Sequence, residues 1–101
     1  MKRSALLLMG KSFIPERHMA EFDLHGQGNN CCLYTVRDKQ EARDKVLELK
    51  ENGFGVIELC GAFGRDFALE LIELTNGEVG IGYVVYEPEQ HGLVERFFGN
   101  E

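Results

Sequence analysis

The sequence has few cysteines and no long hydrophobic run, and both shortages exclude whole classes of protein. Only three cysteines occur among the 101 residues, and none of them forms a C-x-x-C pair. The spacing therefore offers no disulfide framework. No apolar stretch approaches the roughly 20 residues that a membrane-spanning helix needs, so we expect no membrane association. The adjacent Cys31 and Cys32 fit a strand, and we interpret them as unreactive core residues.

Positive charge is also scarce. The chain has 11 Lys and Arg against 17 Asp and Glu, which gives a net charge of −6. Such a chain repels phosphate backbones and its basic residues form no stripe, so we expect no nucleic-acid partner. His18, His25 and His91 lie far apart without H-x-x-x-H spacing, so we predict no metal site. Gly61 and Gly64 match no nucleotide-binding pattern, and we expect no cofactor.

The N-terminus begins like a signal peptide but lacks the necessary length. Basic residues at positions 2 and 3 precede an apolar run that ends at Met9. Lys11 then interrupts the pattern before any small-residue cleavage site. We therefore interpret this segment as a first strand and expect a cytoplasmic protein.

What the sequence does contain is the pattern of one α/β domain. With 101 residues that are 44% hydrophobic, the chain can bury one core, and we expect a single domain over residues 1–101. Four short apolar runs mostly lack strict alternation, which predicts strands that helices cover on both faces. These runs are Ser4–Met9, Cys31–Val36, Gly55–Cys60 and Val79–Tyr86.

Helical patterns follow three of these runs. Asp38 and Glu41 form a capping box that opens a helix, and Gly53 ends it. A second helix is predicted over residues 64–75. A C-terminal helix is expected within residues 88–101, because a proline suits the first helical turn, and we expect that it packs on a partner chain.

The connection between the first two apolar runs is interpreted as a crossover to a parallel strand, with a short helix at residues 15–22 and a loop at residues 26–30. Right-handed crossovers favour a three-layer, flavodoxin-like half-sheet of four mostly parallel strands in the order 2-1-3-4. The fourth strand then lies at an edge, which invites pairing. We expect a homodimer through this edge or through Phe97 and Phe98; alternatively, the last helix covers the edge within one chain.

Glu58 is the most unusual residue, because it lies within an apolar run. Strand periodicity puts it on the same face as Cys60. A buried carboxylate must pair, be solvated in a pocket or be protonated. Two interpretations stay open, a general base or ligand-orienting group and a structural ion pair. The candidate partners for a pair are Lys11, Arg37 and Arg65.

Cys60 is a candidate nucleophile, because a helix N-terminus and Arg65 would lower the pKa of its thiol. The segment from Cys60 to Arg65 resembles, over six residues, the C-x4-R active-site loop of rhodanese-type sulfurtransferases. The alternative is an inert core thiol, since Asp66 and Glu58 both oppose activation.

The turn that follows Glu58 and Cys60 is the predicted ligand site. Ligands of open α/β sheets bind beyond the carboxyl ends of strands, where the strand order reverses. Backbone N–H groups at such a turn lie at the positive end of a helix dipole and bind anions, which predicts a small carboxylate or phosphate. The predicted ligand-binding residues are Lys11, Ser12, Arg37, Gly61, Ala62, Phe63, Gly64 and Arg65.

The stretch from Gly55 to Gly64, with Pro15-Glu16-Arg17-His18 upstream, resembles a family of small bacterial and archaeal proteins. That family is known only as a domain of unknown function. The shared core, I-E-L-C-G-x-F-G, begins at Ile57, and the resemblance runs from the first strand through the fourth. It implies a compact α/β fold and supplies no activity, cofactor or catalytic residue.

Three hypotheses for function follow. The first is a small-molecule-binding module in which the turn receives an acidic group and Lys11 or Arg37 neutralises it. The second is a small enzyme that uses Glu58 as base or Cys60 as nucleophile. The third is a dimeric interaction protein in which the fourth strand and the last helix form the only functional surface.

Overall fold

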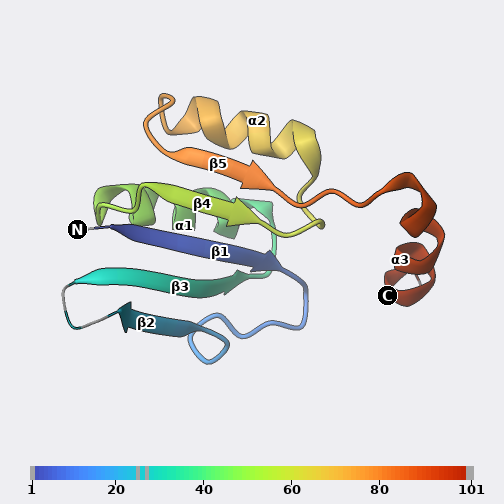
Figure 1. Ribbon diagram of the computed structural model, residues 1–101, viewed down its shortest axis with the longest axis horizontal. Coiled ribbons are helices and arrows are strands. Elements are labelled where there is room, and N and C mark those ends of the chain that lie inside the picture. Colours follow the sequence, from blue (N-terminus) through green and yellow to red (C-terminus); the bar gives the residue numbers. More distant parts are fainter. Residues whose placement is uncertain (1, 25, 27, 100–101) are drawn as a thin grey trace.

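A five-stranded sheet with two helices on one face forms the body of the molecule (Figure 1). The computed structural model describes residues 2–24, 26 and 28–99. The elements are β1 (Arg3–Met9), β2 (Ala20–Leu24), β3 (Asn29–Val36), α1 (Lys39–Glu51), β4 (Val56–Leu59), α2 (Gly64–Leu74), β5 (Gly80–Tyr83), the 3-10 turn η1 (Pro88–Gln90) and α3 (His91–Phe98).

The sheet is mixed, and its strands follow the order β2-β3-β1-β4-β5. β3, β1, β4 and β5 run parallel, whereas β2 is antiparallel to β3. The predicted count of four strands is therefore wrong, although the four parallel strands keep the expected relative order. β5 lies at an edge, as expected, but is only four residues long.

The predicted short helix at residues 15–22 is wrong, because Ala20–Leu24 forms the fifth strand. Gly26 and Gly28 adopt left-handed backbone conformations (φ 62° and 74°), which let the chain reverse between β2 and β3. The segment predicted as a loop is correspondingly shorter, since β3 already begins at Asn29. Phe22, which lies in this strand, is 56% exposed.

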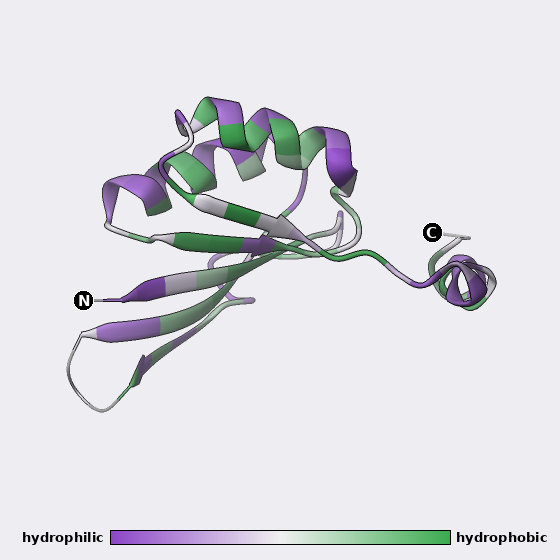
Figure 2. Ribbon diagram, turned by 45° about the horizontal axis from the view of Figure 1, so that its top comes forward, coloured by the Kyte–Doolittle hydropathy of each residue, from purple (hydrophilic) through white to green (hydrophobic). Residues whose placement is uncertain are grey.

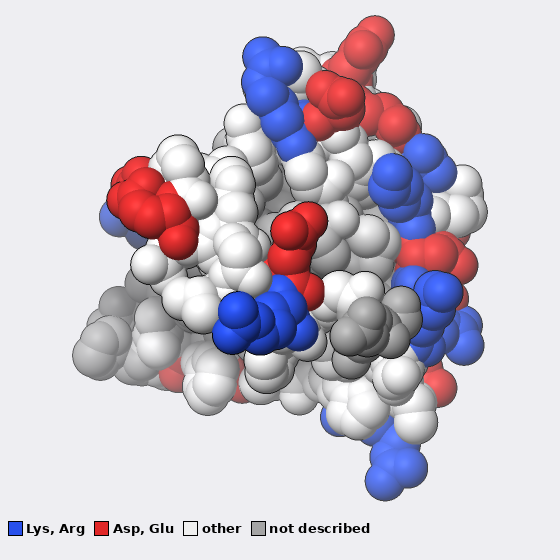
Figure 3. All heavy atoms as spheres, turned by 90° about the vertical axis from the view of Figure 1, so that its right-hand side faces the viewer, with Lys and Arg blue, Asp and Glu red and all other residues white. Residues whose placement is uncertain are grey.

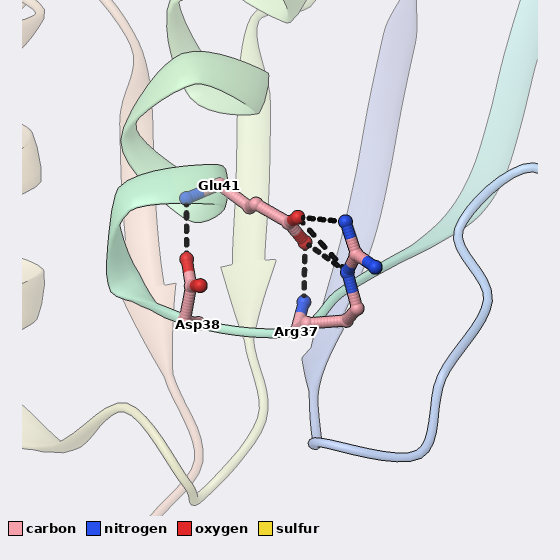
Figure 4. A network of polar contacts seen from close by, with 3 residues as sticks. All are labelled: Arg37, Asp38 and Glu41. Carbon is pink, nitrogen blue, oxygen red and sulfur yellow. Dashed lines mark hydrogen bonds and ion pairs between the residues drawn. The ribbon is translucent and has the colours of Figure 1, made fainter.

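The Asp38 half of the predicted capping box of α1 is present, whereas the return hydrogen bond of Glu41 goes to the residue before the cap. The Asp38 side chain accepts a hydrogen bond from the backbone N–H of Glu41 (2.9 Å). The Glu41 carboxylate in turn accepts one from the backbone N–H of Arg37 (2.8 Å), as Figure 4 shows. Gly53, with φ 84°, ends the helix as predicted, because glycine tolerates this conformation. These contacts fix where α1 leaves the carboxyl end of β3.

The core lies between the sheet and the two helices. Leu7, Ile57 and Leu59 of the sheet are fully buried, as are Val46 and Leu71 of the helices. Each of these strand residues belongs to the alternate set that faces α1 and α2. Burial of this single interface supplies the main stabilisation of the domain.

The opposite face of the sheet is open (Figure 2). Phe22 of β2 lies opposite Cys31 of β3. Ser4 of β1 lies opposite Cys31 on one side and Val56 of β4 on the other, so these four residues form one row across that face. Phe22 and Val56 are 56% and 43% exposed. The predicted three-layer arrangement is therefore wrong. The expectation that Cys31 is a core residue is also wrong, whereas Cys32 is buried as expected.

Helix α3 does not cover this open face. An extended segment carries it beyond the end of β5, where it lies apart from the sheet (Figures 1 and 2). Leu93, Phe97 and Phe98 are 58%, 78% and 54% exposed, and the two phenylalanine rings meet edge to face. The chain therefore presents two separate apolar surfaces.

The one-sided core predicts a sharp contrast between two leucines of α2. Leu71 is fully buried and Leu69 is 44% exposed. We expect Leu71→Ala to lower the free energy of unfolding by about 2–5 kcal/mol, because it leaves a cavity against the sheet. Leu69→Ala is the matched control and should change it by less than about 0.5 kcal/mol. Urea denaturation followed by circular dichroism measures both; equal losses would contradict the assigned core.

Candidate functional site

The predicted strand–turn–helix segment is present at the end of β4. The N–H of Cys60 donates to the carbonyl of Leu7 (3.0 Å), and the N–H of Phe63 donates to the carbonyl of Cys60 (3.2 Å). Gly64 then opens α2 with a φ of 76°. The turn lies beside the carboxyl end of β1, as the sequence predicted.

Several residues of this turn serve packing. Phe63 is buried and its ring stacks on that of Phe67, with centroids 5.7 Å apart. The ring of Tyr86 lies over Gly61, since a methyl group built at Gly61 would come within 3.1 Å of it. Ala62 and Gly64 are exposed. Among the described residues no side chain caps the first N–H groups of α2.

Glu58 and Cys60 have different surroundings. Glu58 is exposed on the open face and has no ion pair in the described part of the chain. Cys60 is half-buried and packs against the core. Their roles as catalytic base and nucleophile stay predictions.

The cations predicted for the site are dispersed. Lys11 and Ser12 are exposed in the loop after β1, and Arg65 is exposed on α2. Arg37 forms an ion pair with Glu41, through hydrogen bonds that raise the pKa of Arg37 and lower that of Glu41 (Figure 4). Viewed from the end of the molecule where α3 lies, side chains of both signs are interspersed with uncharged surface (Figure 3).

The structure also reveals a groove that the sequence did not predict. It runs between α1 and the β2–β3 side of the sheet, and we call it the α1 groove. Two adjoining cavities of about 410 and 380 Å³ form it. The residues that line both cavities are Met19, Tyr34, Lys45 and Glu48.

Tyr34 forms the centre of the α1 groove. Its hydroxyl donates a hydrogen bond to Oε2 of Glu21 (2.6 Å), and Nζ of Lys45 lies 4.2 Å from its ring centroid. On the core side, its ring meets that of Phe54 edge to face. Burial and the adjacent Glu21 carboxylate raise the pKa of Tyr34 far above its ordinary value. The phenol is therefore held in its protonated form.

The groove carries an excess of negative charge. Five carboxylates and three cations line its two cavities. Arg37 pairs with Glu41, and Lys45 pairs with Glu48 at 2.9 Å. The third cation, Arg3, lines the same cavity as Glu21, so the surplus of two negative charges rests on Glu16 and Asp44 in the adjoining cavity, while Glu21 is held beside Tyr34. Glu21 was missed, because residues 15–22 were interpreted as a short helix and not as the start of β2, which places Glu21 beside Tyr34.

The model of a family of unknown function, DUF6506, matches residues 2–99. The chain belongs to this family. The match confirms the expected membership of a family of unknown function, and DUF6506 assigns no activity to the groove or the turn. No curated protein and no solved structure is significantly similar to this DUF6506 protein.

Two further findings concern residues 2–24, 26 and 28–99 alone. No cluster of three or more His, Cys, Asp or Glu side chains suited to a metal ion occurs in these residues of the DUF6506 protein. None of the helices formed by these residues is long and apolar enough to cross a membrane.

The buried phenol predicts a specific dependence of stability on pH. The folded protein binds the Tyr34 proton more tightly than the unfolded chain, whose tyrosines ionise near pH 10. Below about pH 10 both states are protonated and this contribution to stability is complete. Above about pH 10 the unfolded state alone loses the proton, so the free energy of unfolding falls.

We therefore expect the wild-type protein to lose stability more steeply above about pH 10 than Tyr34→Phe does. Urea denaturation at a series of pH values measures both slopes. Tyr86→Phe, which removes a hydroxyl outside the groove, is the matched control and should keep the wild-type slope. Identical slopes for the wild type and Tyr34→Phe would contradict the assigned state of Tyr34.

Proposed function

We propose that this DUF6506 protein is a small-molecule-binding module whose ligand occupies the α1 groove. The observation that carries the proposal is the position of Tyr34, a largely buried phenol with a strongly raised pKa that lines both cavities. Concave sites in which polar groups and perturbed ionisable groups converge are the usual places for ligands.

The chemistry of the groove favours a ligand with an apolar body and a hydrogen-bond donor. Met19 and the Tyr34 ring provide apolar contact surface, and Glu21 presents a carboxylate beside them. The surplus negative charge favours a protonated amine over a carboxylate or phosphate. The ligand class thus differs from the anion that the sequence predicted for the turn.

Titration with three ligands of one skeleton tests this proposal. We expect 2-phenylethylamine to bind more tightly than 2-phenylethanol, and 3-phenylpropionate to bind least, because only the amine offsets the carboxylates. Amide chemical shifts of residues 34, 35 and 45 in NMR spectra report binding in the groove. The reverse order of affinities would rule out this ligand class.

Glu21→Gln should weaken binding of the amine by about tenfold, since it removes one charge-assisted hydrogen bond. The matched control is Glu51→Gln, which removes the same charge from the end of α1, outside both cavities. Equal losses for the two variants would show a general charge effect and contradict a built site at Glu21.

A small anion at the turn before α2 is a second candidate function. The specific observation in its favour is the first turn of α2, whose N–H groups have no side-chain cap among the described residues. Asp66 lies in the same turn and opposes an anion, and the Tyr86 ring covers Gly61. Lys11, which the sequence analysis predicted to neutralise a bound anion, is then the candidate cation for this site.

Titration with inorganic phosphate at constant ionic strength tests the second candidate. We expect shifts of the amide signals of residues 61–65 and an affinity that falls several-fold in Lys11→Gln. Lys2→Gln is the control, because Lys2 precedes β1 whereas Lys11 follows it. Shifts that are uniform over the surface, or equal in both variants, would remove the turn as a site.

A further inference from the structure

Two apolar surfaces of this chain lack a partner within the described residues. One is the open face of the sheet, where Phe22 and Val56 are exposed, and the other is the side of α3 that carries Leu93, Phe97 and Phe98. Among the helices and strands of the described residues, η1, which directly precedes α3, is the element that packs closely against it. Exposed apolar surfaces of this extent mark interaction sites.

The segment that joins β5 to α3 directs the helix away from its own sheet. The N–H of Val84 continues the ladder by donating to the carbonyl of Leu59 (2.9 Å). Beyond it, the Tyr86 ring lies over Gly61, and Nε2 of His91 lies 3.0 Å from the carbonyl oxygen of Tyr86. These contacts hold the present exit direction of the segment.

We propose that the open face binds α3 of a second copy of this chain, so that two copies exchange their C-terminal helices. Exchange of a terminal element across a short extended hinge is a common route to dimers. The inference concerns the face opposite the α1 groove and does not rest on the proposed ligand.

The open face offers a place for the aromatic side chains of α3. A hollow of about 560 Å³ lies at its amino-terminal end, and its lining includes Leu24, Cys31 and Val56. The exposed apolar side chains of α3 and those of the face each offer on the order of 350 Å². Reciprocal docking buries four such surfaces, about 1,400 Å², which is the size of a stable protein interface.

Charge restricts the orientation in which α3 can cover the open face. Glu58 lies in the open face next to Leu6 and Gly82, and an apolar cover would desolvate its carboxylate at a cost of several kcal/mol. α3 carries Arg96 at one border of its apolar side and Glu95 at the other, so it supplies a cation in the orientation that turns Arg96 toward Glu58. Face-to-face stacking leaves the phenylalanines of both α3 helices in water.

Three double variants of the full chain test the exchange. The face variant is Phe22→Ser/Val56→Ser, and the helix variant is Phe97→Ser/Phe98→Ser. Leu47→Ser/Leu69→Ser is the control, because these two leucines are 38% and 44% exposed on the helical layer. Sedimentation equilibrium measures the dimer dissociation constant, and far-UV circular dichroism confirms that each variant is folded.

We expect the wild type and the control to form dimers, and the face and helix variants each to dissociate at least tenfold more readily. An equimolar mixture of these two variants should associate more tightly than either variant alone, because the native helix of the face variant meets the native face of the helix variant and restores one of the two contacts. Isotope labelling of one copy should give contacts between Phe97 of one chain and Phe22 of the other.

A dimer that survives in the helix variant and is lost in the face variant would show face-to-face stacking and overturn the exchange. A wild type that stays monomeric at every concentration would overturn it as well. A mixture that associates no more tightly than either variant alone, with both variants folded, would equally contradict a helix from one copy on the face of the other.

Discussion

The constraint on which the structure depends is that the chain covers one face of its sheet and not the other. The crossovers from β3 to β4 and from β4 to β5 move across the sheet in the same direction. Because such crossovers are right-handed, α1 and α2 lie on the same side. A helix in the first crossover would cover the second side, but that segment supplies β2 at the sheet edge instead. The domain therefore has a single core, between the sheet and its two helices.

The α1 groove and the open face both result from this arrangement. Two helices packed about 10 Å apart cover roughly four strands spaced about 4.8 Å apart. The fifth strand, β2, lies beyond α1, so Glu21 and Tyr34 meet in the uncovered corner. On the other face, Phe22 has no helix above it at all. Neighbouring residues of one edge strand thus contribute to two different surfaces, and the two proposals can fail independently.

The sequence allowed the local structure to be predicted wherever backbone chemistry decides it. Asp38 caps the start of α1, and Gly64 provides the left-handed entry to α2. The number of layers could not be predicted. A continuous apolar run such as Leu6-Leu7-Leu8 occurs both in strands that helices cover on two faces and in strands whose second face binds another chain. β2 was missed for a related reason. Met19 and Phe22 are three residues apart, which fits a helix as well as an amphipathic strand.

Glu58 shows how far such an error extends into reasoning about function. A carboxylate within an apolar run is costly only if the strand is buried on both faces, and on that premise Glu58 was expected to be a general base, a ligand-orienting group or one partner of a structural ion pair. With one face open, Glu58 is solvated in the single chain, and its position carries no such cost. The cost returns when a second surface covers the face. Glu58 therefore restricts what can bind there, because an entirely apolar partner would leave its charge unpaired, whereas a helix that turns Arg96 rather than Glu95 toward it can neutralise it.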